Sequence, residues 1–491
     1  MVLTIRSMRT LNKTPQPGPN EQMKLWKFSA ALLIVLTTGA ACFAGELLPS
    51  ETALDRYVAQ PDENYTWKVV GEKSEDGLTS YVIDMASQKW RTRKDVNQPI
   101  WRHWLVVARP DEVVSETGFL FIGGGHNGGR APDGATDVIR QIAQATKTVV
   151  AELRMVPNQS LVFHNDGQGR VEDDLIGYTW DQFLKTGDAN WPARNPMVKS
   201  AVRAMDTMTA FAAGEQGGKL TVDKFVVAGG SKRGWTTWLT GAVDKRVAAI
   251  IPIVIDVLNV DISMRHHHAA YGFWAPAVGN YVQHKIMERL NHPRMKALYE
   301  LVDPYYYRHR LTMPKFIVNA AGDEFFLPDS SRFYFDDLEG EKHLRYVPNA
   351  NHSLNGSDAI ESIVAFYSMI LLGANRPQYS WSMESDGSIR VESEQAPRQV
   401  KLWQATNPDA RDFRLETLGA KYTSTPLEPA GNGLYVGNVD APEKGWTAFF
   451  VELTYDIGAT VPAKFTTAVR VVPDTLPFAD KDPTAPVGKQ R

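Results

Sequence analysis

Apolar runs of strand length alternate with polar or helix-compatible segments through most of the chain. Because strands that alternate with helices form a parallel sheet covered on both faces, this pattern predicts an α/β domain over residues 45–375 with a mostly parallel central sheet. Three earlier extended stretches are typical of antiparallel strands that open such a sheet. The antiparallel stretches are residues 65–70, 79–85 and 101–108, and the later runs are 118–122, 148–153, 225–228, 248–255 and 315–319.

Two long segments, 156–200 and 257–312, interrupt this alternation. Connections in compact domains are usually short, so longer segments beside a sheet commonly carry function. Both segments are rich in aromatic residues, among them Trp180, Trp191 and Trp274. We expect these insertions to form a lid or a pocket wall, and an enlarged structural subdomain is the open alternative.

Closely spaced extended runs follow residue 376. Seven short runs, separated by turn residues, lie between residues 379 and 472. This spacing is typical of an antiparallel sandwich, and we expect an immunoglobulin-like β-sandwich over residues 376–473. The last segment, 474–491, contains Asp-Pro and Ala-Pro steps, so we expect a disordered tail there.

The N-terminal 44 residues are typical of an export signal. Lys24 and Lys27 precede an apolar stretch, 28–36, which small residues follow. The stretch is too short to span a bilayer, so we expect no transmembrane segment. Because a signal normally begins close to its basic segment, we expect translation to start at Met23. We therefore predict a secreted or periplasmic protein from which residues 1–44 are removed.

Charge and cysteine content narrow the set of partners. Without residues 1–44 the chain holds 48 Lys and Arg against 55 Asp and Glu, a net charge of −7. A mildly acidic chain is a poor match for nucleic acid or an anionic membrane. The only cysteine is Cys42, so a chain cut after Ala44 has no thiol nucleophile and no disulfide. A lipid anchor at Cys42 is the open alternative, which Gly39 disfavours because such signals usually carry leucine there.

One of the apolar runs breaks at a serine. It ends at Gly229, Ser231 follows, and helix-compatible residues come next. A strand, a sharp turn and a helix with serine at the apex form the nucleophile elbow of α/β-hydrolases, where glycines make room for a strained backbone. The usual elbow has glycine two residues after the serine. Here Arg233 takes that position and the glycine comes one residue later, at Gly234.

A serine nucleophile needs a base, and the base needs an acid that orients it. In α/β-hydrolases the acid and then the histidine follow the serine along the chain, each after a later strand. His352 lies on a loop before the last predicted helix of the domain and is the candidate base. Asp323, after the run 315–319, is the first choice of acid, and Glu324 and Asp256 are the alternatives.

The tetrahedral intermediate of acyl transfer needs backbone amide donors. In α/β-hydrolases they come from a loop after an early strand and from the residue that follows the serine. Gly123, Gly124 and Gly125 form such a loop, and Lys232 follows the serine. The side chains of Lys232 and Arg233 either add positive charge near the oxyanion or pair with carboxylates of the insertions.

Three consecutive histidines, His266, His267 and His268, are the strongest candidates for metal ligands. Consecutive side chains point in different directions, and no neighbouring carboxylate completes a zinc pattern. We therefore expect no metal site, and a place in the pocket wall is the alternative. Serine hydrolysis needs no cofactor, and we expect none.

Nine short motifs are distributed over the chain, at residues 87–90, 101–103, 123–126, 180–183, 195–199, 229–235, 255–259, 322–326 and 348–352. Together they resemble the PhoPQ-activated pathogenicity-related protein family, whose members are secreted or envelope proteins of the α/β-hydrolase type. The resemblance implies this fold over roughly residues 50–475 but implies no substrate. The elbow is also similar to that of glucuronoyl esterases, which implies a carbohydrate-linked ester as one substrate class.

We therefore predict a serine esterase that acts through Ser231, His352 and Asp323 by an acyl-enzyme. The expected substrate is a small-molecule or carbohydrate-linked ester. Similar proteins in some eukaryotes are regarded as secreted signals, so the resemblance also implies an alternative. That alternative is a non-catalytic interaction or signalling protein on the same scaffold.

Overall fold

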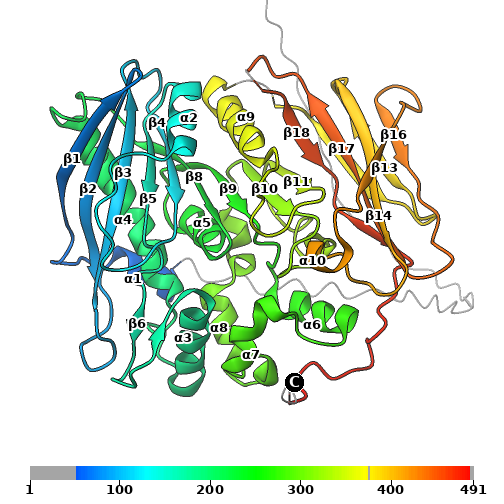
Figure 1. The fold of residues 1–491 in the computed structure, drawn as a ribbon, viewed down its shortest axis with the longest axis horizontal. Helices are drawn as coiled ribbons and strands as arrows, with labels where there is room; N and C mark the ends of the chain where they lie inside the picture. Colours follow the sequence, from blue (N-terminus) through cyan, green and yellow to red (C-terminus); the bar gives the residue numbers. More distant parts are fainter. Residues whose placement is uncertain (1–50, 374–375, 460, 487–491) are drawn as a thin grey trace, which may run out of the picture. The chain divides into compact units, whose positions relative to one another are not determined.

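The computed structural model describes residues 51–373, 376–459 and 461–486 (Figure 1). The predicted export signal, with Met23 and Cys42, lies outside these residues, and its predictions stay predictions. Part of the predicted disordered tail is described, and it is ordered against the insertion 257–312. There the amide of Phe478 donates to the carbonyl of Ala269, with 2.9 Å between nitrogen and oxygen.

Fourteen strands form one sheet. They are β1 (Thr66–Glu75), β2 (Leu78–Lys89), β3 (Ile100–Pro110), β4 (Thr117–Ile122), β5 (Val150–Leu153), β8 (Lys224–Gly230), β9 (Val247–Ile253), β10 (Lys315–Ala320), β11 (Lys342–Val347), β14 (Gln399–Asn407), β15 (Thr423–Pro426), β17 (Trp446–Tyr455), β18 (Ala463–Thr466) and β19 (Arg470–Val472). Their order is β1-β2-β3-β5-β4-β8-β9-β10-β11-β18-β17-β14-β15, with β19 also on β17.

The sheet is mixed, so the prediction of a mostly parallel sheet is wrong. Six strands, from β5 to β11 in the sheet order, are parallel to one another. The strands on both flanks pair antiparallel. A parallel pair needs a long crossover, whereas a tight turn such as that between β1 and β2 imposes an antiparallel pair.

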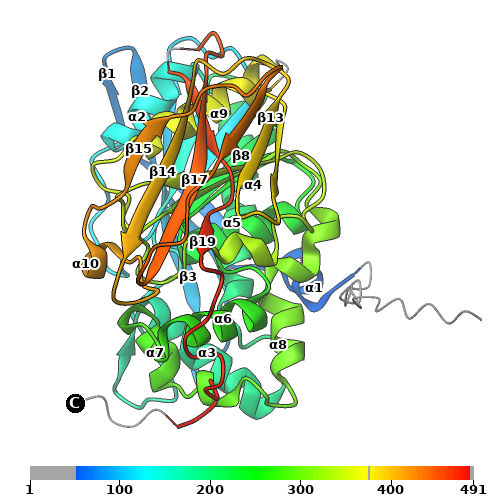
Figure 2. The ribbon, with the colours of Figure 1, turned by 90° about the vertical axis from the view of Figure 1, so that its right-hand side faces the viewer.

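The C-terminal strands continue this sheet. β18 pairs with β11 through Leu344 and Thr466, and β17, β14 and β15 follow outward (Figures 1 and 2). Only β12 (Tyr379–Met383), β13 (Ile389–Ser393) and β16 (Leu434–Gly437) form a separate three-stranded sheet. Its residue Val391 shares one apolar core with Leu402 of β14 and Val451 of β17. An independent immunoglobulin-like sandwich is therefore not confirmed, because one of its two layers is an extension of the central sheet.

Helices cover both faces of the parallel strands. Alternate residues of β8 face opposite sides, as strand geometry requires. Val227 belongs to the core under α4 (Arg194–Ala213) and α5 (Lys232–Val243). Val226 belongs to the core under α2 (Asp137–Thr146) and α9 (Ala359–Leu372). This two-sided burial explains why the sequence of β8 is an unbroken apolar run.

The two predicted insertions form the helices drawn along the lower side of Figure 1. The second also contains short 3-10 helices, and the first contains a small hairpin. The main elements are β6 (Leu161–Val162), β7 (Gly169–Arg170), α3 (Glu172–Thr186), α6 (Val260–Tyr271), α7 (Gly279–Gln283) and α8 (Met295–Val302). Two further short helices are α1 (Ala53–Ala59) and α10 (Leu415–Leu418).

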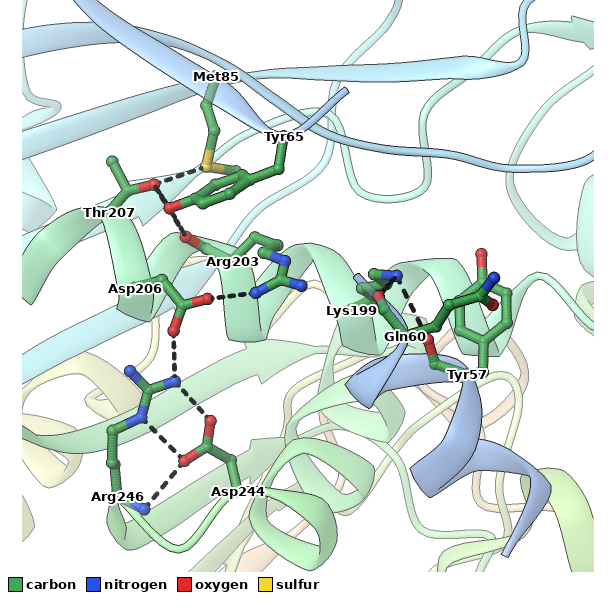
Figure 3. A network of polar contacts seen from close by, with 10 residues as sticks. All are labelled: Tyr57, Gln60, Tyr65, Met85, Lys199, Arg203, Asp206, Thr207, Asp244 and Arg246. Atoms are coloured by element: carbon green, nitrogen blue, oxygen red, sulfur yellow. Dashed lines mark hydrogen bonds and ion pairs between the residues drawn. The ribbon is translucent and has the colours of Figure 1, made fainter. Parts of the chain in front are cut away.

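Polar contacts fix α4 against its neighbours (Figure 3). Asp206 accepts from Arg203 of the same helix and pairs with Arg246, just after α5, at 2.8 and 2.9 Å. Arg246 also pairs with Asp244 at the end of α5, at 2.6 Å. Lys199 donates to main-chain carbonyls at the end of α1. The position of α4 relative to α5 is therefore set by charge-assisted bonds as well as by apolar packing.

One buried ion pair joins the C-terminal strands to the parallel strands. Arg345 of β11 and Glu452 of β17 are both almost fully buried, and their side chains are hydrogen-bonded. Arg345 also donates to Asp358 at the start of α9, at 3.0 Å. A buried guanidinium that loses a partner carries a large desolvation penalty.

We predict that Glu452→Ala lowers the free energy of unfolding by about 3 kcal/mol, because it leaves the buried charge of Arg345 undercompensated. Denaturant titration followed by tryptophan fluorescence measures the change. Asp456→Ala is the matched control, because it removes the acid of an exposed ion pair. The side chain of Asp456 is 69% exposed, and that of its partner Arg398 is 63% exposed. Removal of that exposed pair should cost less than about 0.5 kcal/mol. Equal losses in the two variants would contradict the prediction.

Candidate active site

Ser231 lies between the end of β8 and the start of α5 with an unusual backbone. Its φ is 58° and its ψ is −126°, a conformation that residues other than glycine rarely adopt. Its amide donates to the carbonyl of Ile253, at 2.8 Å, which helps to hold this geometry. The strand, turn and helix around Ser231 match the elbow that the sequence predicts.

The two glycines of the elbow are required by close packing. A Cβ on Gly229 would lie 2.8 Å from the carbonyl oxygen of Arg233. A Cβ on Gly234 would lie 2.8 Å from the carbonyl oxygen of Gly229 and 2.9 Å from that of Ile253. After the serine, the position that leaves no room for a Cβ is therefore 234 and not 233, and position 233 carries an arginine.

The structure brings His352 and Asp323 together. Asp323 follows β10 and His352 follows β11, and Nδ1 of the ring lies 2.8 Å from Oδ2 of the carboxylate. Oδ1 of Asp323 accepts from the amide of Phe325 at 2.8 Å, so the carboxylate is fixed on both oxygens. Burial raises the pKa of Asp323, while the charge and hydrogen bond of His352 oppose that rise.

The two alternative acids have other partners. Glu324 accepts from the backbone amide of His352 at 3.0 Å, so it holds the loop rather than the ring. Asp256 accepts from the hydroxyls of Tyr334 and Tyr346, at 2.6 and 2.5 Å. Burial raises the pKa of Asp256 to about 8, although both hydroxyls oppose the rise. Both oxygens of Asp256 are therefore occupied by tyrosine hydroxyls and not by the ring of His352.

The other ring nitrogen of His352 is unbonded. Nε2 is buried and makes no hydrogen bond with any residue that the structure describes. The ring packs against Phe325, with 4.3 Å between ring centroids. Ser231 and His352 line the same cleft. Nδ1 is thus held by Asp323, and Nε2 is the nitrogen left to exchange a proton with a group in the cleft.

The predicted oxyanion donors differ in their availability. The amide of Gly123 donates to the carbonyl of Leu153 at 2.8 Å, so in this structure it is not free to donate to an oxyanion as predicted. Its place at the end of β4 explains this, because it continues the hydrogen bonding of the sheet to β5. Within the described chain, the amides of Gly124 and Gly125 make no hydrogen bond. Lys232 is the first residue of α5, where amides have no partner within the helix.

The side chains after Ser231 pair with the first insertion. Nζ of Lys232 lies 2.8 Å from Glu172 and 3.2 Å from Asp173. Arg233 donates to both carboxylate oxygens of Glu172, at 2.6 and 2.8 Å. Of the two alternatives for these side chains, pairing with insertion carboxylates is therefore the one observed. The pairs join α3 to the first turn of α5.

A second cavity, enclosed by the insertions, also reaches Ser231. Its walls are mostly aromatic and aliphatic, and its charged lining residues are Asp173, Arg194 and Lys232. The aromatic content of both insertions pointed to such a wall. Nothing in the local sequence singled out Arg194, because its position depends on how α4 packs against α5.

The three histidines of α6 are buried outside this cavity wall. His266 lies 3.1 Å from Asp329, and His267 accepts from the amide of Ala275 at 3.1 Å. Burial, together with nearby positive charge, lowers the pKa of His267 to about 3. Among the described residues, no group of three His, Cys, Asp or Glu side chains is arranged to hold a metal. The second insertion lines the cavity with apolar residues of α6, not with these histidines.

Most of the chain matches a known protein family. A family model described as PhoPQ-activated pathogenicity-related protein matches residues 54–414. The chain belongs to this family. A family relative, autocrine proliferation repressor protein A of Dictyostelium discoideum, is 38% identical over 476 residues, which covers 91% of this chain and 94% of that protein. None of the helices in the described ranges is long and apolar enough to cross a bilayer.

Solved structures show weaker likeness to this PhoPQ-related protein. An acetyl xylan esterase from Paenibacillus sp. R4 matches with a TM-score of 0.47 and 15% sequence identity. The match covers 67% of this chain and 96% of the esterase chain. A glucuronoyl esterase from Solibacter usitatus matches with a TM-score of 0.35 and 13% sequence identity. That match covers 64% of this chain and 87% of the esterase chain. These TM-scores are low, and we draw no conclusion about function from them.

The Glu172 cluster makes a pH-dependent contribution to stability. Burial alone would raise the pKa of Glu172, but the hydrogen bonds and charges of Arg233 and Lys232 lower it from 4.5 to about 2. A lowered pKa means that the stabilisation is complete above pH 4.5 and is lost as the pH falls toward 2.

We predict that Glu172→Gln is destabilising at neutral pH and that its difference from wild type shrinks between pH 4.5 and 2. Denaturant titrations at a series of pH values measure this difference. Glu215→Gln is a matched control in an exposed pair, with Glu215 85% exposed, and should differ little from wild type throughout. A Glu172→Gln difference that stays constant with pH would contradict the prediction.

Proposed function

We propose that this PhoPQ-related protein is a serine hydrolase that cleaves esters. The observation that carries the proposal is the hydrogen bond between Asp323 and Nδ1 of His352, with Nε2 unbonded in the cleft that Ser231 also lines. A buried carboxylate on one nitrogen fixes the ring orientation and stabilises the imidazolium that forms when the other nitrogen takes a proton. The strained backbone of Ser231 supports its assignment as the nucleophile.

In the first half of the proposed mechanism, Oγ of Ser231 attacks the ester carbonyl while Nε2 of His352 takes the hydroxyl proton. The amide of Lys232 and those of the Gly124–Gly125 turn donate to the oxyanion. The carbon–oxygen bond to the alcohol then breaks, and His352 returns its proton to the leaving alkoxide. Water repeats the sequence on the acyl-enzyme and releases the acid. Asp323 keeps its negative charge throughout.

Esters are preferred over peptides for two reasons. No specificity pocket for a peptide side chain can be recognised in the sequence, and the cavity beside Ser231 is mostly apolar. An acyl chain fits such a wall better than an extended polar backbone does. The likeness of the elbow to glucuronoyl esterases supports a carbohydrate-linked ester as one substrate class. The basic and apolar segment before Gly45 supports export to the periplasm or the medium.

We predict that Ser231→Ala, His352→Ala and Asp323→Asn each lower kcat/KM for a p-nitrophenyl ester by at least about 10³-fold. Asp256→Asn and Glu324→Gln should have clearly smaller effects, because neither carboxylate contacts the His352 ring. Stopped assays at pH 7.5, with circular dichroism as a control for folding, measure these effects. Full activity of folded Ser231→Ala would refute the proposal, and full activity of Asp323→Asn would move the acid to another residue.

A second candidate is a secreted signal without catalysis. The relative from Dictyostelium discoideum is named as a repressor of proliferation, and the match to this chain covers 94% of that relative. Addition of purified wild-type and Ser231→Ala proteins to cultures of that organism separates the two candidates. Repression by both proteins favours the signal, whereas repression by wild type alone ties the effect to hydrolysis.

A further inference from the structure

The cavity beside Ser231 contains one cation, Arg194, that forms no ion pair with any residue that the structure describes. Trp180, Trp235 and Tyr299 are among its aromatic walls, and most of its remaining lining is aliphatic. Arg194 also lines this cavity, although it is only 1% exposed. A guanidinium stays protonated even in such an environment.

The contacts of Arg194 leave part of its guanidinium unused. One Nη donates to the carbonyl of Lys232 at 2.9 Å, and the group stacks on Trp235, with 4.3 Å between the guanidinium carbon and the ring centroid. The guanidinium also interacts with the hydroxyl of Tyr281 and with the charge of Asp173. Nε is buried and has no hydrogen-bond partner in the described ranges. No Asp or Glu of the described chain forms an ion pair with the guanidinium of Arg194. Buried donors without a partner are rare in native proteins.

The nearby carboxylates are engaged by other groups. Glu172 binds Arg233 and Lys232, and Asp173 lies 3.2 Å from Nζ of Lys232 and accepts from Tyr281 at 3.1 Å. The next carboxylate along α3, Asp174, lies 2.6 Å from the His284 ring. The five-residue cluster of Arg194, Lys232, Arg233, Glu172 and Asp173 therefore has three positive and two negative side chains. Within this cluster the positive charges exceed the negative charges by one, and Arg194 is the member without an ion-pair partner.

We propose that Arg194 binds a carboxylate on the acyl part of the ester, so that the cavity selects acid-terminated acyl groups. A single surplus charge matches a monoanion, and a guanidinium with a free N–H suits the planar acceptors of a carboxylate. The apolar walls accommodate the methylene chain or ring between this carboxylate and the ester carbonyl at Ser231. The proposal rests on the proposed ester hydrolysis for its kinetic test, but not for its binding test.

The kinetic test compares two esters with acyl chains of six carbons, p-nitrophenyl hexanoate and the mono-p-nitrophenyl ester of adipate. The readout is the ratio of kcat/KM for the adipate ester to that for the hexanoate ester. Wild type should prefer the adipate ester, and Arg194→Gln should lower the ratio at least tenfold. Arg194→Lys, which keeps the charge but loses the planar fork, should retain an intermediate ratio.

Arg203→Gln is the matched control, because it changes the same residue type on α4, where Arg203 pairs with Asp206 outside the cavity. Its ratio should equal that of wild type. An unchanged ratio in Arg194→Gln, with both esters slowed equally, would overturn the proposal and assign Arg194 to the fold or the oxyanion. If Arg194→Gln does not fold, Arg194→Met, which also removes the charge but keeps an apolar stem, takes its place, and an unchanged ratio in that variant overturns the proposal.

The binding test uses Ser231→Ala, which cannot turn over substrate, and calorimetric titration with monomethyl adipate. Binding by Ser231→Ala that weakens at least tenfold in Ser231→Ala/Arg194→Gln supports the site, even if no ester is hydrolysed by wild type. Hydrolysis of esters without any binding of monomethyl adipate would overturn the site and leave the hydrolase proposal intact.

Discussion

The packed turn at Ser231 is the constraint on which the rest of the site depends. A residue with a Cβ is held at a φ of 58° because β8, β9 and the first turn of α5 converge there. Two glycines permit this approach, and their hypothetical Cβ atoms would fall within 3 Å of main-chain oxygens. The strain is maintained by the sheet on one side and the helix on the other. It holds the hydroxyl clear of the sheet, at the end of the parallel strands, where the loops of Asp323 and His352 also begin.

The insertions and the C-terminal strands both support this turn and its neighbours. From one side, α3 binds the first turn of α5 through the carboxylates that pair with Lys232 and Arg233. From the other side, the amide of Leu415 in α10 donates to the carbonyl of Gly322, just before Asp323, at 2.9 Å. Asn349, just before His352, exchanges hydrogen bonds with the backbone of Tyr422, both at 2.9 Å. The C-terminal segment therefore fixes the loops that carry Asp323 and His352.

Much of this could be predicted because it is local. The elbow and the alternation of strands and helices are visible as short patterns, and the expected order of serine, acid and histidine follows from the fold that such an elbow indicates. The pairing of β18 with β11 could not be predicted, because it depends on a hydrogen-bonded contact between residues more than one hundred positions apart. The engaged amide of Gly123 and the tyrosine partners of Asp256 likewise depend on neighbouring strands. Arg194 could not be recognised, since a lone arginine on a helix gives no sign of a buried, unneutralised charge.

The central claim is that Ser231 is an activated nucleophile. A fluorophosphonate reacts covalently and rapidly with such a serine, and peptide mass spectrometry after proteolysis locates the adduct. We predict a single adduct on Ser231, with a second-order rate constant at least about 10³-fold lower when His352 is replaced by alanine. A folded wild-type protein that acquires no adduct, or an adduct on a different serine, would contradict the account.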